Sequence, residues 1–294
     1  MKLGRYLNSV EAANLLGVNV STIKRWTDSG KLNCLQTPGG HRKFLMRHIN
    51  EFLHDKSDKA QKITIVPYDT SECRRINHLI QKHQISELCP ILLSAALKSD
   101  RKIVNMIVTG LALAQYPVYK LFDELIVPVL RQIGALWEQG SLTVAEEHIA
   151  SDIIRDSILM VREIIIKTDK PSQKVFCFAL DDDQHDIPLK MSQVLLEQKG
   201  YEVFYSGQRT PADSLEKLMA EHKPARIYLS STYFDENWTE EQLDGKYAEL
   251  EIIYQLSEKF GFDIYIGGRA FDNLKYNNKL IKRRLTTFEE VYKY

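Results

Sequence analysis

An apolar run in the C-terminal half of the chain ends in a cluster of acids and one histidine. Val175–Leu180 is followed by aspartates at 181–183, then by His185, and Pro188 opens a helical pattern. We expect a strand, a loop and a helix start, with His185 at the carboxyl end of the strand, where open α/β sheets bind ligands. A neutral imidazole there can bind a metal through one nitrogen while Asp183 orients it through the other. On this stretch alone, a solvated surface histidine is the more common interpretation.

The spacing Asp183-x-His185-x-x-Pro188 resembles the DxHxxG signature of cobalamin-binding domains, with Pro188 where that family has glycine. The helix and strand expected over 189–207 also resemble that family. The resemblance implies that His185 binds the cobalt of the cofactor in place of the cofactor's own base. Proline is compatible with a helix start, but its ring adds bulk where the family's glycine lets the nucleotide tail pass.

Length, charge and cysteine content limit the class of protein. The chain has 294 residues, enough for two or three domains, and a formal net charge of zero, so any preference for an acidic partner must be local. The cysteines, which form no CxxC pair, are Cys34, Cys73, Cys89 and Cys177. This pattern argues against zinc fingers and disulfide scaffolds, and no segment reaches the ~20 apolar residues of a membrane span. We therefore expect a soluble, cytoplasmic protein.

The first 70 residues predict a DNA-binding head. Ser9–Gly17 and Val20–Gly30 read as two short helices joined by a tight turn, which is a helix-turn-helix. Leu32–Gln36 and His41–Phe44, separated by a Pro-Gly-Gly turn, read as a hairpin wing. Residues 1–55 carry eight lysines and arginines against four acids, a positive patch on a neutral chain.

Two groups of side chains in this head are the expected DNA contacts. The second helix would present Ser21, Thr22, Lys24 and Arg25 to the major groove, and the wing would present His41, Arg42 and Lys43 to the backbone or minor groove. The segments Val-Ser-Thr-Ile-Lys-Arg-Trp and Gly-Gly-His-Arg-Lys-Phe resemble the winged helix-turn-helix of MerR and excisionase-like regulators. The resemblance implies binding to a double-stranded DNA operator. One head covers one half-site, so we expect self-association into a dimer or tetramer.

Residues 71–170 show helical periodicity after a polar linker at 56–69. Breaks at Cys89-Pro90, Ser99-Asp100, Tyr116-Pro117 and Gln139–Ser141 leave room for four to five helices, which predicts a four-helix bundle.

Within this bundle lie Trp137, Glu147 and His148. On spacing alone, such a tryptophan is usually core and such a Glu-His pair is usually surface. The W-x9-EH arrangement resembles the helical cap of the CarH/LitR-type light-responsive repressors, which are MerR-family regulators with a cobalamin-binding sensor domain. It implies that Trp137 packs against the adenosyl group of adenosylcobalamin and that Glu147 and His148 contact the cofactor. Glu138 follows the tryptophan, where some light-sensing members have a histidine nearby that captures cobalt.

Residues 171–294 alternate strands and helices, which predicts a flavodoxin-like parallel sheet, the fold of cobalamin-binding Rossmann-like domains. The expected strands are Val175–Leu180, Tyr201–Tyr205, Arg226–Ser231, Ile264–Gly267 and Arg284–Thr287. The expected helices are Pro188–Lys199, Pro211–His222, Thr239–Phe260 and Arg269–Leu280.

Two further loops lie at the same sheet edge as His185. Ser230 and Thr232 end the third strand with hydroxyls, and Gly267 and Gly268 end the fourth with residues that let a ligand approach the backbone. In cobalamin domains the matching elements line the slot for the nucleotide tail. The acidic insert 233–242 is longer than this connection requires, and the sequence assigns it no function.

Three hypotheses follow. The first is a transcriptional repressor whose oligomeric state and operator binding are controlled by adenosylcobalamin and light. The second keeps the DNA-binding regulator but leaves its pocket without cofactor or gives it another tetrapyrrole. The third is an enzyme component, a corrinoid methyl carrier or mutase subunit. A DNA-reading head has no place in such an enzyme and no acid–base constellation stands out, so we expect that the protein is not an enzyme.

Overall fold

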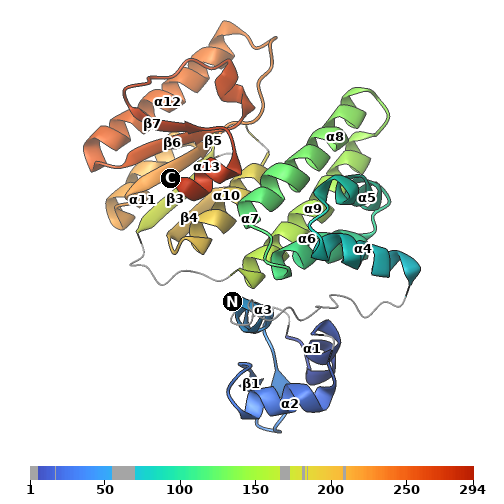
Figure 1. Ribbon diagram of the computed structural model, residues 1–294. Helices are drawn as coiled ribbons and strands as arrows, with labels where there is room; N and C mark the ends of the chain where they lie inside the picture. Colours follow the sequence, from blue (N-terminus) through green and yellow to red (C-terminus); the bar gives the residue numbers. More distant parts are fainter. Residues whose placement is uncertain are drawn as a thin grey trace. The chain divides into compact units, whose positions relative to one another are not determined.

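The computed structural model describes residues 6–16, 18–54, 70–165, 173–180, 183, 185–207 and 210–294. The chain forms two compact units, Met1–Ile166 and Lys167–Tyr294 (Figure 1). The predicted division of the first unit into a head and a separate bundle stays a prediction. Gly17, the linker at 56–69 and the predicted boundary at 170/171 lie outside the described residues.

The first unit begins with the expected winged helix-turn-helix. Its elements are α1 (Ser9–Leu15), α2 (Val20–Asp28), the antiparallel strands β1 (Leu35–Gln36) and β2 (Arg42–Lys43), and α3 (Met46–His54). Gly30 ends the second helix region at φ +70, a backbone angle that costs glycine nothing. Trp26 is a core residue, 8% exposed, with its ring centroid 4.7 Å from that of Phe52. Both rings belong to one mixed aliphatic and aromatic core, with Ile23, Phe44 and Ile49, that holds the small head together.

The helices that follow form the expected bundle. They are α4 (Ser71–Gln81), α5 (Ile85–Leu97), α6 (Arg101–Leu113), α7 (Val118–Lys120), the π-helical turn η1 (Leu121–Ile126), α8 (Val127–Glu138) and α9 (Val144–Ile164). Side-chain caps at Thr70, Asp100 and Thr143 satisfy first-turn N–H groups of α4, α6 and α9. Thr143 and Glu146 form a reciprocal capping box, so α9 has a sharply defined start.

The predicted break at Cys89-Pro90 is wrong, because α5 runs through Pro90. The proline removes one N–H that would bond to the carbonyl of Ser86. Ser86 is exposed, so water can satisfy that carbonyl, and the helix continues. The other predicted breaks fall between helices.

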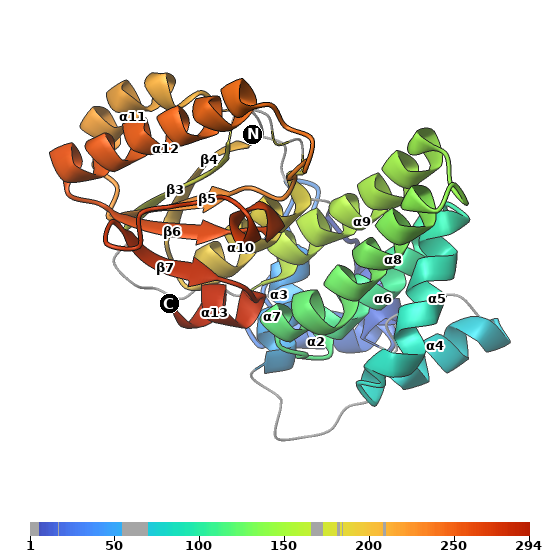
Figure 2. The same cartoon turned by 90° about the horizontal axis from the view of Figure 1, so that it is seen from above.

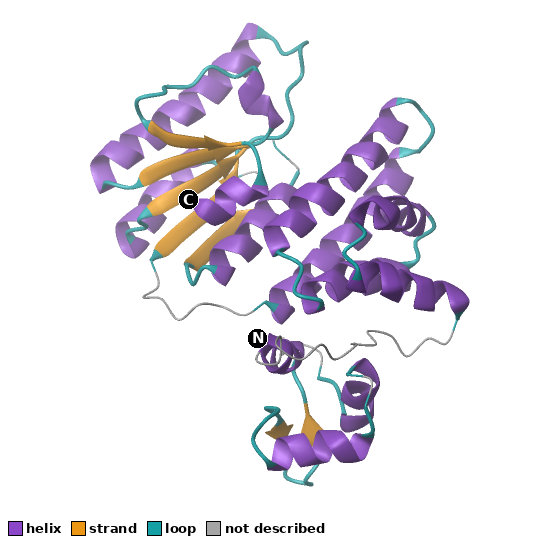
Figure 3. Cartoon of the chain, viewed as in Figure 1, coloured by secondary structure: helices purple, strands orange, loops and turns teal. Residues whose placement is uncertain are grey.

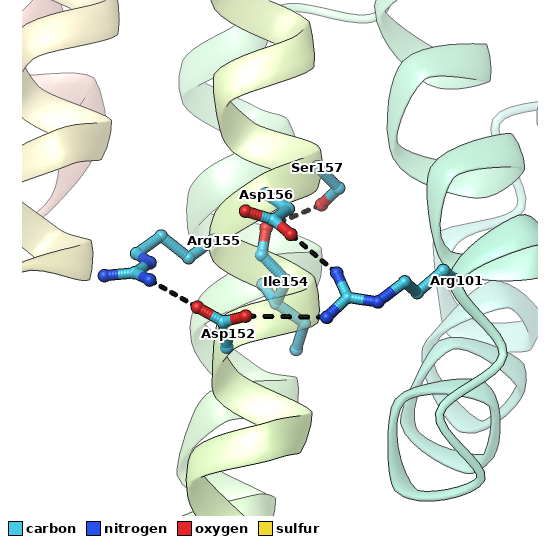
Figure 4. Close-up of polar contacts among 6 residues, drawn as sticks. All are labelled: Arg101, Asp152, Ile154, Arg155, Asp156 and Ser157. Atoms are coloured by element: carbon cyan, nitrogen blue, oxygen red, sulfur yellow. Dashed lines mark hydrogen bonds and ion pairs between the residues drawn. The ribbon is translucent and has the colours of Figure 1, made fainter.

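An ion-pair network fastens the start of α6 to the middle of α9 (Figure 4). Arg101 Nη1 donates to Asp156 Oδ2 at 2.6 Å, and its Nη2 lies 3.5 Å from Asp152 Oδ2. Asp152 also accepts from Arg155 on the same helix. These partners are well exposed, so each pair contributes modestly, but together they fix the direction of two long helices.

A buried amide joins the head to the bundle within the first unit. Asn50 of α3 is 6% exposed, and its Nδ2 donates to the backbone carbonyl of Ile164 at 2.9 Å. Its Oδ1 accepts from Gln115 Nε2 at 2.6 Å, in the turn after α6. Both ends of the amide are therefore satisfied by partners from the bundle, as buried polar groups require.

The second unit is a parallel five-stranded sheet between helices, as expected (Figure 3). Its strand order is β4-β3-β5-β6-β7, the flavodoxin-like order. The strands are β3 (Lys174–Ala179), β4 (Glu202–Gly207), β5 (Arg226–Ser230), β6 (Asp263–Gly267) and β7 (Ile281–Leu285). The helices are α10 (Ile187–Gln198), η2 (Ala212–Ser214), α11 (Leu215–His222), α12 (Glu240–Phe260), η3 (Arg269–Asp272) and α13 (Phe288–Lys293).

The two faces of this sheet are covered by different helices. Figure 2 shows α11 and α12 on one face and α10 and α13 on the other. Beneath α11 and α12 lies the main core, in which Phe178, Ile227 and Ile264 are fully buried. Such near-continuous apolar strands are typical of a sheet buried on both faces.

The predicted helix Arg269–Leu280 is wrong, because only the short 3-10 turn η3 forms there. Gly268 has no side chain that could cap a helix at this point, and Asn277 instead closes a turn by accepting from the Lys279 N–H at 3.0 Å. The last strand begins at Ile281 instead of Arg284, and α13 was not predicted. Among the described residues, no helix combines the length and apolarity that a bilayer crossing demands.

Candidate functional site

The loop after β3 holds His185 against a buried carboxylate. The Asp183 side chain is 1% exposed, and its Oδ1 accepts from the His185 backbone N–H at 2.8 Å and lies 2.9 Å from His185 Nδ1. A carboxylate accepts only, so Nδ1 carries the proton and Nε2 has the lone pair that a metal takes. The His185 side chain is 54% exposed. The structure therefore gives the imidazole the tautomer and the accessibility of a metal ligand.

The same carboxylate also joins two strand ends. The backbone N–H of Thr232, which follows β5, donates to Asp183 Oδ2. Across the sheet, Ala179 pairs with Ser230 and Ser230 pairs with Gly267, so the strands end level with one another. The loops carrying His185, Thr232 and Gly268 are thus neighbours along one carboxyl edge, as the sequence predicted.

Hydroxyl groups at this edge lack protein partners. Ser231 Oγ and Thr232 Oγ1 are buried and have no hydrogen-bond partner among the described residues, while Ser230 is 6% exposed. Leaving a buried hydroxyl unsatisfied costs about 1–3 kcal/mol, so such groups usually face a ligand or water. Their position beside Asp183 makes them candidate contacts for a bound molecule.

Gly268 is required by the packing at this edge, and Gly267 is not. Gly268 has φ +106, and a Cβ added there would lie 2.1 Å from the carbonyl oxygen of Ser231. A Cβ on Gly267 would meet only the Leu285 carbonyl oxygen, at an ordinary 3.5 Å. Gly268 therefore allows the end of β6 to lie close to the hydroxyl-bearing end of β5.

These residues fit a corrinoid. A corrinoid brings its own cobalt and most of the metal's ligands, so the protein would need to supply a single nitrogen, and His185 would supply it. In the part of the chain that the structure describes, no group of three or more His, Cys, Asp and Glu side chains gathers to hold a metal. The unsatisfied hydroxyls of Ser231 and Thr232 suit the polar nucleotide tail of such a cofactor. Pro188 lies in the first turn of α10, where a proline is accommodated.

The cap residues lie at one end of the α8–α9 hairpin. Trp137 is 45% exposed, so the interpretation of this tryptophan as a core residue is wrong. Glu147 accepts from Ser151 Oγ at 2.7 Å and lies 3.6 Å from the Nε2 of His148, whose side chain is 73% exposed. Val144 is also exposed. Trp137 near the end of α8 and Val144 at the start of α9 are therefore exposed apolar side chains at this end of the hairpin.

The predicted DNA contacts lie at the surface of the head, with one qualification. Exposed or partly exposed are Ser21, Thr22, Lys24, Arg25, His41 and Lys43. Arg42 instead forms an ion pair with Asp28, Nη2 to Oδ1 at 2.6 Å, and its side chain is only 18% exposed. Arg42 joins the wing to the last residue of α2, so this ion pair helps to hold the wing and α2 at a fixed spacing.

One residue beside His185 could not be selected as a site residue from the sequence. The ring of Tyr233, the third residue of the β5–α12 connection, lies nearly parallel to the imidazole, with a centroid distance of 6.4 Å and an interplanar angle of 19°. Only the unexplained length of the insert pointed to this connection.

Comparison with known proteins gives two family matches. Residues 6–57 match a helix-turn-helix domain model, and residues 91–161, which span most of α5 through α9, match a B12 binding domain model. The second match includes Trp137, Glu147 and His148.

Two relatives cover most of the chain. The HTH-type transcriptional repressor CarH of Myxococcus xanthus is 26% identical over 237 residues, 75% of this chain and 77% of the relative. The monomethylamine corrinoid protein of Methanosarcina barkeri has a similar fold, with a TM-score of 0.55 at 13% identity over 71% of this chain and 96% of that one. Both domain matches lie on one polypeptide, which is similar to the CarH repressor over three quarters of its length.

Proposed function

We propose that this protein is a transcriptional repressor whose operator binding is controlled by adenosylcobalamin and by light. The observation that carries the proposal is the buried Asp183, which orients His185 as a metal ligand beside two unsatisfied hydroxyls. The similarity to the CarH repressor supports the regulatory part. The third hypothesis, an enzyme component, leaves the helix-turn-helix head without a role.

The head would read an operator through α2 and the wing. Lys24 and Arg25 are exposed on the helix that enters the major groove in such domains, and Lys43 extends from the wing. A head of this size contacts one half-site, so the proposed repressor binds as a dimer or tetramer. The contribution of phosphate contacts would appear as a strong dependence of affinity on salt.

The sheet unit would hold the cofactor. His185 would bind the cobalt, Ser230, Ser231 and Thr232 would line the tail, and Gly268 would give the tail room. Bound adenosylcobalamin supplies a cobalt–carbon bond that light cleaves. Trp137 would pack against the adenosyl group, and loss of that group would leave the indole without its apolar partner. Glu138 follows Trp137, so this position would offer a carboxylate and not an imidazole.

The signal would reach DNA as a population shift. A cofactor changes operator affinity only if it binds two assembly states with different affinities. Trp137 and Val144 are exposed apolar side chains of the helical unit. If the cofactor covers them in one assembly state and not in the other, cofactor binding favours the first state. The proposed repressor therefore binds its operator best in the dark with adenosylcobalamin bound.

The test is a dark titration of the full chain with adenosylcobalamin, followed by absorption spectra, light scattering and operator binding before and after illumination. We expect tight binding, a spectrum that light changes, and weaker operator binding afterwards. His185→Ala should weaken cofactor binding at least tenfold. The matched control, His78→Ala, removes an exposed histidine of α4 and should bind normally. Absence of corrinoid binding at saturating cofactor would refute the proposal.

A second candidate is favoured by Pro188, whose ring stands where the family signature has glycine. In that case the same DNA-binding regulator has a pocket that stays without cofactor or takes another tetrapyrrole. The same titration, repeated with haem and with cobinamide, separates the two candidates.

A further inference from the structure

The insert after β5 approaches the candidate metal ligand. It begins directly beyond Thr232, whose N–H holds Asp183, and continues to the cap of α12 at Thr239. Its first side chain, Tyr233, is 46% exposed and lies beside His185. One connection therefore provides both a hydrogen bond to the orienting carboxylate and a ring next to the imidazole.

The geometry of the two rings is that of an offset, nearly parallel pair. The centroids are 6.4 Å apart and the planes differ by 19°. Aromatic pairs attract one another over about this distance range. Asp183 fixes the imidazole at its Nδ1 edge, and the Tyr233 ring lies next to it.

Tyr233 is itself held in place. Its hydroxyl donates to Asp235 Oδ2 at 3.1 Å, and Asp235 also accepts from the backbone N–H of Asn237 at 2.9 Å. The edge of its ring meets Trp238 at a centroid distance of 5.9 Å and an angle of 76°.

The insert is anchored in the core of the sheet unit. Phe234 and Trp238 pack against the buried apolar cluster under α12, and the two rings meet edge to face at 5.1 Å. Lys246 of α12, only 8% exposed, places its Nζ 5.9 Å from the Trp238 ring centroid. An acidic segment that reads as a surface loop in sequence is therefore fixed at its aromatic positions.

We propose that Tyr233 is a positioning residue for His185, which holds the imidazole in the orientation that binds the cobalt of a corrinoid. The inference rests on the proposed function, because it assumes that His185 is the ligand. A half-exposed imidazole that is held at one edge and beside one face loses less freedom when it binds metal. Removal of the ring should therefore weaken corrinoid binding about two- to tenfold.

The test compares Tyr233→Ala, Tyr233→Phe and the control Tyr292→Ala, which removes an exposed tyrosine of α13. Each full-length variant, with ¹⁵N-labelled histidine, is titrated with cob(II)alamin and with cobinamide in the same oxidation state. The electron paramagnetic resonance spectrum then reports directly whether a labelled histidine nitrogen is bound to cobalt. Thermal melting of the ligand-free variants shows whether the insert still folds.

We expect Tyr233→Ala to bind both corrinoids more weakly and to show a smaller fraction of histidine-bound cobalt. Tyr233→Phe keeps the ring and should resemble the parent protein, as should Tyr292→Ala. If Tyr233→Ala has parental affinity and a parental histidine-bound fraction, the positioning role is refuted. A weaker affinity with an unchanged histidine-bound fraction refutes it as well. If the parent protein binds no corrinoid, the proposed function fails first, and the two failures are thereby distinguished.

Discussion

Replacement of Gly268 by alanine should damage both the stability and the ligand site of the sheet unit. The new Cβ would lie 2.1 Å from the Ser231 carbonyl oxygen and 2.6 Å from its carbonyl carbon, and φ is +106. The backbone conformation, with ψ 156, costs a residue with a side chain about 1–3 kcal/mol. Relief of the overlap by backbone shifts costs about another 1–3 kcal/mol. We therefore expect a loss of about 2–6 kcal/mol.

The displaced atoms belong to the site. Ser231 precedes Thr232, whose N–H donates to Asp183, so a shift of the Ser231 carbonyl also moves the support of His185. Loss of such a supporting contact commonly lowers metal affinity about 10–100-fold. The variant should melt roughly 10 °C lower and bind cobalamin at least tenfold more weakly.

The assay is thermal unfolding by circular dichroism, with a parallel cobalamin titration at low temperature, where the variant is folded. Gly267→Ala is the matched control, because its Cβ would meet only the Leu285 carbonyl oxygen at 3.5 Å. It should melt within a few degrees of the parent protein. Equal melting temperatures for the two variants would show that the approach of β6 to Ser231 is looser than described, and the reasoning would be wrong.

Asp183→Asn should weaken cobalamin binding about 10–100-fold by spectroscopic titration, because the amide has no charge and only one acceptor oxygen for the N–H groups of His185 and Thr232; an unchanged dissociation constant would argue against His185 as ligand. Pro188→Gly should tighten cobalamin binding but not binding of cobinamide, which lacks the nucleotide tail, and equal gains for both would rule out a tail clash. Lys24→Ala should reduce the slope of log affinity against log salt by about one in fluorescence anisotropy, whereas an unchanged slope excludes a phosphate contact. Thr287→Ala removes the cap that accepts from the Glu290 N–H and should cost about 1 kcal/mol in urea unfolding; no change in the midpoint would mean that α13 adds nothing to stability.

The alternation of apolar strands and amphipathic helices was enough to predict the architecture. Local signals carry this information: Asp100 and Thr239 cap helices where the sequence has a polar residue before a periodic run. The helix–turn–helix and its wing followed from the glycines and the basic strand. The predicted fold class is therefore confirmed, and the similar fold of a corrinoid protein of known structure agrees with it.

The errors arise where a local signal was weighed without its surroundings. Pro90 is a strong helix breaker by type, but its position above an exposed carbonyl makes it tolerable. The segment 273–280 has enough apolar residues for a helix, yet its asparagines close turns, and the hydroxyl of Tyr254 accepts from the Asn277 N–H across the loop. The missed helix α13 did have a signal, the Thr287–Glu290 capping box.

For the site, spacing predicted the Asp183–His185 pair because both residues lie in one short loop. The unsatisfied hydroxyl of Ser231 and the ring of Tyr233 could not be selected from sequence, since their roles depend on which loops lie next to each other. The exposure of Trp137 also depends on how the helices pack and could not be predicted from the sequence. An amphipathic stripe predicts that an indole lies near the core-facing side, but only the packed helices show that this one is left half exposed.

Helix α9 is a single rod that carries different contact residues at its two ends. Its first turn carries Glu147 and His148, and the last carbonyl at Ile164 accepts the hydrogen bond from Asn50 of the DNA-reading head. With 21 residues at ~1.5 Å each, the rod spans roughly 30 Å. The predicted cofactor contacts and the support of the head therefore belong to opposite ends of one continuous helix. A substitution that loosened the C-terminal turn of α9 would remove one of the two hydrogen bonds of Asn50 and leave its buried amide half satisfied.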